Sequence, residues 1–336
     1  MRIDVVLRYV GSVMLFIALF MLLSAVISYV SGVDSSFFPL LLFAPPTALL
    51  GAVPVFFVGK GGQIVDTEGF CIVVGSWLVA CVVSMFPYRI WGGEFSLVNA
   101  WFECVSGFTT TGASILTDVE ILPRGLQFWR FSSTWIGGMG VVMFALLVLP
   151  SLGRSKMTLS NVELSSMAKD NYRYRTQMIV QILLVVYVGL TAVATLLLKI
   201  AGMNWFDALC HAMSACATSG FSTKNSSILF YNSPAIDTIL ILVMAIAGLH
   251  FGLIYATVTG KRSNLFRSEV TRFYVGMLLF CSLAIAVSLY AAALYPTLGA
   301  PLRHACFPFL AVAPPTGDAA PCSNRSTPWP STLPVF

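Results

Sequence analysis

The stretch from Phe95 to Ser114 reads FSLVNAWFECVSGFTTTGAS and decides the fold of this chain. Its first 13 residues, Phe95 to Gly107, are mostly apolar, and the rest is rich in threonine and glycine. A helix of that length rises roughly 20 Å, which is too short for the roughly 30 Å hydrocarbon core of a membrane. Long apolar segments flank it on both sides. The stretch therefore predicts a re-entrant pore loop, because non-helical backbone is tolerated at membrane depth only where it is buried in protein or lines a water-filled cavity.

The pattern occurs again 108 residues later, as WFDALCHAMSACATSGFS from Trp205 to Ser222. One loop alone would favour an interfacial helix that ends in a glycine turn. A second copy, again between two apolar runs of spanning length, favours a pore, because transport proteins often build a central pathway from internal repeats. The shift aligns five identical pairs: Ala100 with Ala208, Ser106 with Ser214, Thr110 with Thr218, Gly112 with Gly220, and Ser114 with Ser222.

The composition places the chain in a membrane. Of its 336 residues, 57% are hydrophobic and only 10% are charged, against about 25% charged in a soluble protein, and the mean hydropathy is +0.86. The apolar runs are about 20 residues long, which indicates helices and excludes a β-barrel pattern of short alternating strands. The net charge of +5 follows from basic loops and does not indicate nucleic-acid binding. The eight cysteines show neither metal-ligand nor disulfide spacing.

These runs predict an all-α polytopic membrane protein. It has two N-terminal helices, two complete repeats of outer helix, pore loop and inner helix, and one further outer helix. The expected spanning segments are 9–30, 37–58, 69–87, 126–150, 178–200, 234–258 and 273–295. The corresponding parts are a two-helix hairpin (1–60), a first pore repeat (61–153), a basic cytoplasmic loop (154–177), a second pore repeat (178–260), the outer helix of an incomplete third repeat (261–296) and an atypical Pro-rich tail (297–336).

The basic residues predict the orientation. Twelve of the 19 Lys and Arg residues lie on the N-terminal side of the membrane and seven on the other. Because cytoplasmic loops carry the excess of positive charge, the N-terminus is expected in the cytoplasm and both pore loops outside. The 154–177 loop either docks a cytosolic partner or lies on anionic lipid.

The Thr-Gly segments that end the two loops suit a dehydrated cation. Such an ion needs several oxygens in place of its water shell, and potassium channels supply backbone carbonyls from four Thr-x-Gly strands. Segments 110–114 and 218–222 supply two such strands, and glycine permits the angles that align successive carbonyls. The pore helices end just before them, so the negative ends of their dipoles favour a cation. Neither strand has a second glycine two residues later, which predicts looser discrimination among monovalent cations than T-V-G-Y-G gives.

Three stretches carry a family resemblance: NAWFECVSGFTTTGAS at 99–114, WIGGMG at 135–140 and CATSGFSTKN at 216–225. They resemble the TrkH-type potassium uptake subunits of the Trk/Ktr/HKT superfamily, over roughly residues 1 to 296. The resemblance implies potassium uptake across the bacterial inner membrane, four repeats around one pore, a TrkA-like cytosolic nucleotide-binding subunit, a homodimer, and no cofactor besides the transported ion. It also implies filter carbonyls from Thr110, Thr111, Gly112, Ala113, Thr218, Ser219, Gly220 and Phe221.

The sequence departs from that family at its end. It has two complete repeats, and its composition changes abruptly near Pro296, so we expect residues 297–336 to be an out-of-frame or truncated end; a genuine disordered tail is the alternative. The alternative function is a non-conducting fragment of such a transporter. A membrane enzyme ranks last, because the three histidines, His211, His250 and His304, and the few buried carboxylates form no cluster of acid, base or metal ligands.

Other residues near the loops have structural interpretations. Glu103 and His211 occupy equivalent places in the two pore helices, where an anchoring role behind the filter is favoured over ion contact. Asn99 and Asp207 are expected to cap the pore helices at their N-termini. The glycines of WIGGMG are expected to allow close packing, with a hinge as the alternative. His250 is expected to be a packed, hydrogen-bonded histidine, with a gating role as the alternative.

Overall fold

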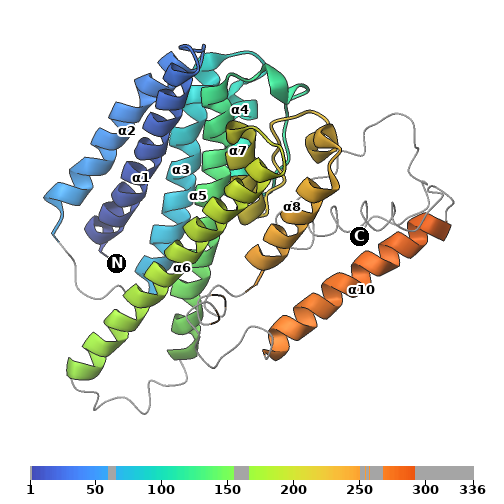
Figure 1. The fold of residues 1–336 in the computed structure, drawn as a ribbon. Helices are drawn as coiled ribbons and strands as arrows, with labels where there is room; N and C mark the ends of the chain where they lie inside the picture. The colour runs from blue at the N-terminus through green and yellow to red at the C-terminus, as the bar shows by residue number, and fades with distance from the viewer. Residues whose placement is uncertain are drawn as a thin grey trace.

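The computed structural model describes residues 2–59, 66–154, 166–249, 254, 257 and 268–291. Within these residues the regular secondary structure is helical throughout (Figure 1). The elements are α1 (Ile3–Val30), α2 (Phe37–Phe57), α3 (Asp66–Trp91), α4 (Leu97–Phe108), η1 (Val119–Ile121), α5 (Arg124–Arg154), α6 (Ser166–Ile200), α7 (Trp205–Ala217), η2 (Ser227–Tyr231), α8 (Pro234–Ala247) and α10 (Glu269–Ala291).

Four helices in the described part of the chain are long and apolar enough to cross a membrane: Ile3–Val30, Phe37–Phe57, Thr67–Trp91 and Leu183–Ile200. Many of their large apolar side chains are exposed, such as Phe56 and Phe57 at the end of α2. Exposed apolar side chains on such helices are expected where the solvent is lipid. The structure therefore confirms a helical, multi-pass membrane protein.

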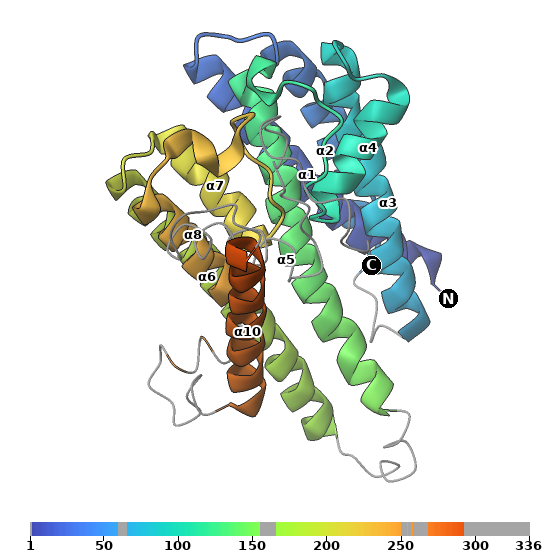
Figure 2. The same cartoon turned by 90° about the vertical axis from the view of Figure 1, so that its right-hand side faces the viewer.

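The two short helices, α4 and α7, lie in the half of the bundle opposite the N-terminus (Figure 1). They are 12 and 13 residues long, so the predicted half-length helices are confirmed. The long helix α5 runs between them (Figure 2). This arrangement places both pore loops around one shared inner helix.

Glycines on α5 allow this close approach. A methyl group built on Gly137 would overlap the backbone of Phe108, at the end of α4. One built on Gly138 would crowd Ala217, at the end of α7, and the hydroxyl of Tyr187. The close-packing interpretation of WIGGMG is confirmed, because α5 meets the last residues of both short helices through these glycines.

The hairpin of α1 and α2 contacts the N-terminal end of α5. Asp34, in the turn between α1 and α2, accepts hydrogen bonds from the hydroxyls of Ser28 and Ser36 and, at 3.2 Å, from the backbone N–H of Gly125. Gly125 lies in the first turn of α5, where backbone N–H groups have no partner within the helix. Asp34 therefore caps α5 from a distant part of the sequence.

Several helix ends differ from the expected ones. Helix α6 begins at Ser166, so residues 166–177 are helical, where a loop was expected over 154–177. Polarity marks where a chain leaves the bilayer and does not mark where its helix ends. Helix α8 ends at Ala247, with Gly248 as its C-cap, and most of the remainder of the expected span to residue 258 lies outside the described residues. His250 and the tail 297–336 lie outside the described residues.

Candidate ion-binding site

The two pore helices begin in the same way. Ser96 accepts a hydrogen bond from the backbone N–H of Asn99 at 3.2 Å, and Asn204 accepts one from Asp207 at 2.8 Å. Ser96 and Asn204 are the N-caps, and they are themselves 108 residues apart. The expectation that Asn99 and Asp207 are the caps is wrong by one helical turn, because these residues supply the N–H groups that are capped.

The pore helices also end in the same way, with the two-bond Schellman motif. In α4, Thr111 donates its N–H to Ser106 and Thr110 donates to Gly107, both at 2.9 Å. The same two bonds recur at the end of α7, from Ser219 to Ser214 at 3.1 Å and from Thr218 to Ala215 at 3.2 Å.

The threonine at the centre of each motif adopts a left-handed backbone. The φ angle is 56° at Thr110 and 53° at Thr218. Glycine usually fills this position, and a residue branched at Cβ is an outlier there. Holding it costs roughly 1–2 kcal/mol, and such strain persists only where the surroundings over-determine the backbone. Both threonines therefore occupy a backbone conformation that locally favours glycine.

The sign of the φ angle alternates from residue to residue through both Thr-Gly segments. Gly112 and Gly220 have φ angles of 78° and 82°, two residues after the left-handed threonines, whereas the residues between and after them do not have positive φ. In an extended strand successive residues point to opposite sides. Alternating the sign of φ instead directs successive carbonyls toward one side, which is the arrangement that a row of ion-coordinating oxygens needs.

The two segments, far apart in sequence, lie against each other. A methyl group built on Gly112 would overlap the carbonyl oxygen of Ser219 and would lie 3.5 Å from the backbone nitrogen of Gly220. Ser219 is fully buried, and Gly112 and Gly220 are partly exposed. The structure thus brings the centres of the two predicted filters together.

Pore-helix serines hold the last carbonyl of each predicted set. Ser106 donates its hydroxyl to the carbonyl of Ala113 at 2.5 Å, and Ser214 donates to that of Phe221 at 2.8 Å. Both carbonyls are therefore directed at their own pore helix. Of the eight predicted residues, Ala113 and Phe221 have carbonyls that accept a serine hydrogen bond. Among the described contacts, no serine bond of this kind reaches the carbonyls of the other six, Thr110 to Gly112 and Thr218 to Gly220.

Side chains behind the filters tie down the residue that follows each segment. Glu103 accepts hydrogen bonds from the Ser114 hydroxyl at 3.0 and 3.1 Å and from the Ile115 N–H at 3.2 Å. At the equivalent place, His211 Nε2 lies 3.1 Å from the Ser222 hydroxyl. His211 Nδ1 lies 2.8 Å from the carbonyl of Asp207, which only accepts, so Nδ1 carries the proton. The anchoring interpretation of Glu103 and His211 is confirmed.

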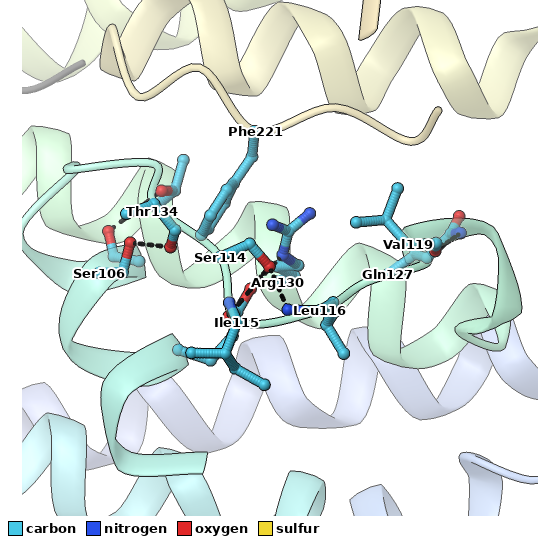
Figure 3. Close-up of polar contacts among 12 residues, drawn as sticks. Ser106, Ser114, Ile115, Leu116, Val119, Gln127, Arg130, Thr134 and Phe221 are labelled. Atoms are coloured by element: carbon cyan, nitrogen blue, oxygen red, sulfur yellow. Dashed lines mark hydrogen bonds and ion pairs between the residues drawn. The ribbon is translucent and has the colours of Figure 1, made fainter. Parts of the chain in front are cut away.

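Arg130 of α5 completes the first anchor. Its Nε lies 2.6 Å from Glu103 Oε1, and the side chains of Arg130 and Glu103 are 4% and 0% exposed. Figure 3 shows the guanidinium beside Ser114 and beside the ring of Phe221, a residue of the second repeat. Sequence reasoning counted Arg130 only in the charge balance. The sequence did carry a signal for it: Arg130 is the one charged residue in the expected span 126–150, and an ionisable group inside a membrane is a functional candidate by default.

The loops that leave the two segments are linked to each other. The side chain of Asn225 accepts from the N–H of Val119 at 2.8 Å and donates to Asp118 at 2.6 Å, and Lys224 lies 3.7 Å from Glu120. The hydrogen bond from Asn225, with one from the Glu120 backbone, lowers the pKa of the Asp118 carboxyl below its ordinary value. The two repeats are therefore joined both at the filters and in the loops beyond them.

Comparison with known proteins agrees with this architecture. The sequence matches the family described as TrkH, cation transport protein, over residues 47–291. It is 33% identical over 278 residues to the Trk system potassium uptake protein TrkH of Salmonella typhimurium, and this match covers 82% of this chain and 57% of that protein. It is 32% identical over 341 residues to the protein of the same name from Halomonas elongata, and this match covers the whole chain and 70% of that protein. The chain thus spans little more than half the length of the first relative.

A solved structure shares the fold. The crystal structure of the potassium transporter TrkH from Vibrio parahaemolyticus matches with a TM-score of 0.80 at 23% identity, over 93% of this chain and 64% of that one. This likeness confirms the predicted fold class, an all-α polytopic membrane protein. It also shows that the arrangement of α1 to α10 is one that a known transporter uses.

Proposed function

This chain belongs to the TrkH family of cation transport proteins, and from that premise we propose that it supplies ion-coordinating segments for potassium uptake across the bacterial inner membrane. The observation that carries the proposal is the repeated backbone of Thr110–Ala113 and Thr218–Phe221. Both segments alternate in hand, and Gly112 of one lies against Ser219 of the other. Carbonyls aligned in this way replace the water shell of a monovalent cation.

The eight candidate carbonyls form two groups, those that accept a hydrogen bond from a pore-helix serine and those that do not. Thr110, Thr111 and Gly112, with Thr218, Ser219 and Gly220, are the proposed first ligands through their backbone carbonyls. Ala113 and Phe221 mark the end of the row, since their carbonyls share their electron pairs with Ser106 and Ser214. The serine bonds fix where the row stops, so they set its length as well as its direction.

The membrane potential would drive the ion without any chemistry on it. One elementary charge gains roughly 2.3 kcal/mol for each 100 mV, so an inside-negative cell draws potassium inward. The chain is therefore proposed to be a transporter subunit with no catalytic residues and no cofactor. The orientation proposed from the basic loops places the N-terminus in the cytoplasm and both filters outside.

Two partners belong to the same proposal. The family resemblance suggests a TrkA-like cytosolic nucleotide-binding subunit and a homodimer. Helices α5 and α6, of 31 and 35 residues, exceed the roughly 20 residues that a bilayer needs, and both extend on the side of the N-terminus (Figure 1). This projecting part supports a docking place for a cytosolic subunit.

Growth of a bacterium that lacks its potassium uptake systems tests the proposal. Cells that express the chain should grow at low external potassium, and cells that express Gly112→Ser should not. The Arg2→Gln variant, altered at the N-terminus far from the filters, is the matched control and should grow like the wild type. Growth no better than with an empty vector, despite insertion in the membrane, would instead favour the non-conducting alternative.

A further inference from the structure

We propose that Arg130 is a positioning residue that couples the two filter segments, so that the geometry of the second depends on the ion pair that anchors the first. The inference rests on the proposed function, because it assigns a role to a residue behind the proposed ion path. It is carried by one fact: a single buried guanidinium holds the anchor of the first filter and the backbone of the second. Its readout, described below, does not require ion flow.

The first arm of Arg130 reaches the first repeat. Its Nε donates to Glu103 Oε1 at 2.6 Å, and Glu103 in turn holds Ser114 and Ile115, the two residues that follow the first filter. A carboxylate alone in this place would be a buried, uncompensated charge, which is strongly destabilising. Arg130 therefore allows Glu103 to act as an anchor for the outer end of that segment.

The second arm reaches the second repeat. Arg130 Nη1 donates to the carbonyl of Ser222 at 3.3 Å, and the guanidinium carbon lies 3.7 Å from the centre of the Phe221 ring. A planar guanidinium stacks on an aromatic face and donates along its edges at the same time, which an ammonium group cannot do. The same side chain thus holds the two residues that end the second filter.

The second repeat has no equivalent of this cation in the described part of the chain. The position 108 residues after Arg130 is Thr238, which is exposed and donates to the carbonyl of Pro234 in its own helix. The counterpart of Glu103 is His211, whose ring nitrogens contact Asp207 and Ser222 of its own repeat, and whose contact with α5 is the ring of Phe131. One arginine from the first inner helix therefore serves both repeats.

A buried ion pair is weak evidence for stability. Apolar residues of similar volume often replace such a pair with no loss of stability, or with a gain. A pair that joins two functional segments is better explained by the geometry that it imposes. We therefore expect that replacing both partners by apolar residues of similar volume changes the filters more than it changes the overall stability of the fold.

Hydrogen exchange of the filter amides, measured by mass spectrometry on the purified chain in detergent, tests the coupling directly. Glu103 makes its hydrogen bonds to the first segment and to Arg130. In Glu103→Gln, the amides of residues 219–223 should nevertheless exchange roughly tenfold faster, as expected when a hydrogen bond to a charged group is lost. In Arg130→Lys, which keeps the charge beside Glu103 but loses the stacking on Phe221, exchange should rise at 219–223 and stay unchanged at Ser114 and Ile115.

The ion pair between Arg2 and Glu68 is the matched control. It joins the same two residue types at 2.9 Å, at the N-terminal end of α1 and α3. Arg2→Gln should leave exchange at both filter segments within the error of the wild type. Unchanged exchange at 219–223 in both Glu103→Gln and Arg130→Lys would overturn the coupling, whichever way the first segment responds.

Ion selectivity gives a second readout that a purely structural role would not move. In proteoliposomes, the ratio of rubidium to sodium flux should fall about tenfold in Arg130→Lys, within the range typical of coupled sites, at equal amounts of folded protein. An unchanged ratio with lower total flux would also count against the inference. Absent flux in the wild type would count against the proposed function alone, because the exchange experiment still reports on the coupling.

Discussion

The two pore loops reach the same backbone with different side chains behind it. Both helices begin at equivalent caps, 108 residues apart, and end in a Schellman motif around a left-handed threonine. Each also donates a serine hydroxyl to the carbonyl of the fourth residue of its Thr-Gly segment. The first loop is then anchored by the ion pair of Glu103 and Arg130, and the second by the imidazole of His211.

This difference shows which part of the loop is constrained. The carbonyl row depends on φ angles and backbone hydrogen bonds, which are shared in detail. The anchor needs only to hold the serine after the filter, and a carboxylate or an imidazole does so equally well. We therefore expect substitutions in the shared backbone elements to have the largest effects, and substitutions in the anchors to have effects that differ between the repeats.

The glycines should give the largest effect and separate the two loops. Gly112→Ala places a methyl group on the carbonyl of Ser219, in addition to the cost of a side chain at positive φ. Gly220→Ala meets at least the second cost, about 1–2 kcal/mol. We expect Gly112→Ala to abolish rubidium uptake in proteoliposomes. We expect Gly220→Ala to transport ions but to lose selectivity for potassium over sodium.

Gly202→Ala is the control for this pair. Gly202 also has a positive φ, of 110°, but a methyl group built on it meets nothing within 4 Å. It should lower the thermal stability slightly and leave uptake and selectivity intact. Wild-type uptake by Gly112→Ala would break the claim that its segment faces the second one.

Relieving the strained threonines should raise stability and lower selectivity. Thr110→Gly and Thr218→Gly each remove a side chain branched at Cβ from a left-handed position, which stabilises the fold by about 1 kcal/mol. The same change removes a hydroxyl and loosens the backbone beside the proposed ligands. We expect a higher melting temperature in detergent with a lower ratio of rubidium to sodium flux; a lower melting temperature for both variants would show that the threonines are not strained.

The pore-helix serines should give a smaller effect that again compares the repeats. Ser106→Ala removes the bond to the Ala113 carbonyl, at a cost of about 1 kcal/mol. Ser214→Ala removes the bond to Phe221 and also a contact of 3.1 Å with the Ser219 hydroxyl, so its cost should be larger. Thermal unfolding of both variants, with Ser12→Ala on the exposed face of α1 as control, tests this order.

The smallest effect should be a change in how the stability of the protein depends on pH, through the cap that Asp34 provides for α5. Burial acts to raise the pKa of Asp34, but hydrogen bonds from Ser28, Ser36 and Gly125 outweigh it and lower the pKa below 3.8. A lowered pKa contributes stability that is present above that value and is lost as the pH falls through the folded-state pKa. Asp34→Asn should therefore be less stable than the wild type at neutral pH, and the difference should shrink below about pH 4.

This pH effect is specific to α5. The cap residue of α8, Ser233, makes no side-chain hydrogen bond to its helix, so an equivalent change there, Ser233→Ala, should leave the pH dependence as it is in the wild type. A stability difference between Asp34→Asn and the wild type that does not change with pH would contradict the capping role of Asp34.

The sequence alone predicted what depends on hydropathy and on the repeat. The half-length helices and four of the seven expected spanning helices follow from apolar run lengths. The pairing of Thr110–Gly112 with Thr218–Gly220 follows from the 108-residue shift. Helix ends were less accurate: the caps are Ser96 and Asn204, one turn before the expected residues, because several polar residues near a helix start satisfy the same pattern.

Contacts between repeats could not be predicted from one sequence. The role of Arg130 depends on α5 passing between α4 and α7, which brings Phe221 and Ser222 within its reach. The serine bonds that direct the Ala113 and Phe221 carbonyls were missed for a related reason. Ser106 and Ser214 were recognised as a repeated pair, but the direction of a carbonyl follows from the fold of the segment after it.

The central claim is that the backbone carbonyls of the two Thr-Gly segments bind a monovalent cation. The most direct test is a crystal structure of the chain grown in rubidium, with data collected at the rubidium absorption edge. The account predicts anomalous density beside the carbonyls of Thr110 to Gly112 and of Thr218 to Gly220, and none there in crystals of Gly112→Ala. Well-ordered segments with anomalous density only elsewhere in the molecule would contradict it.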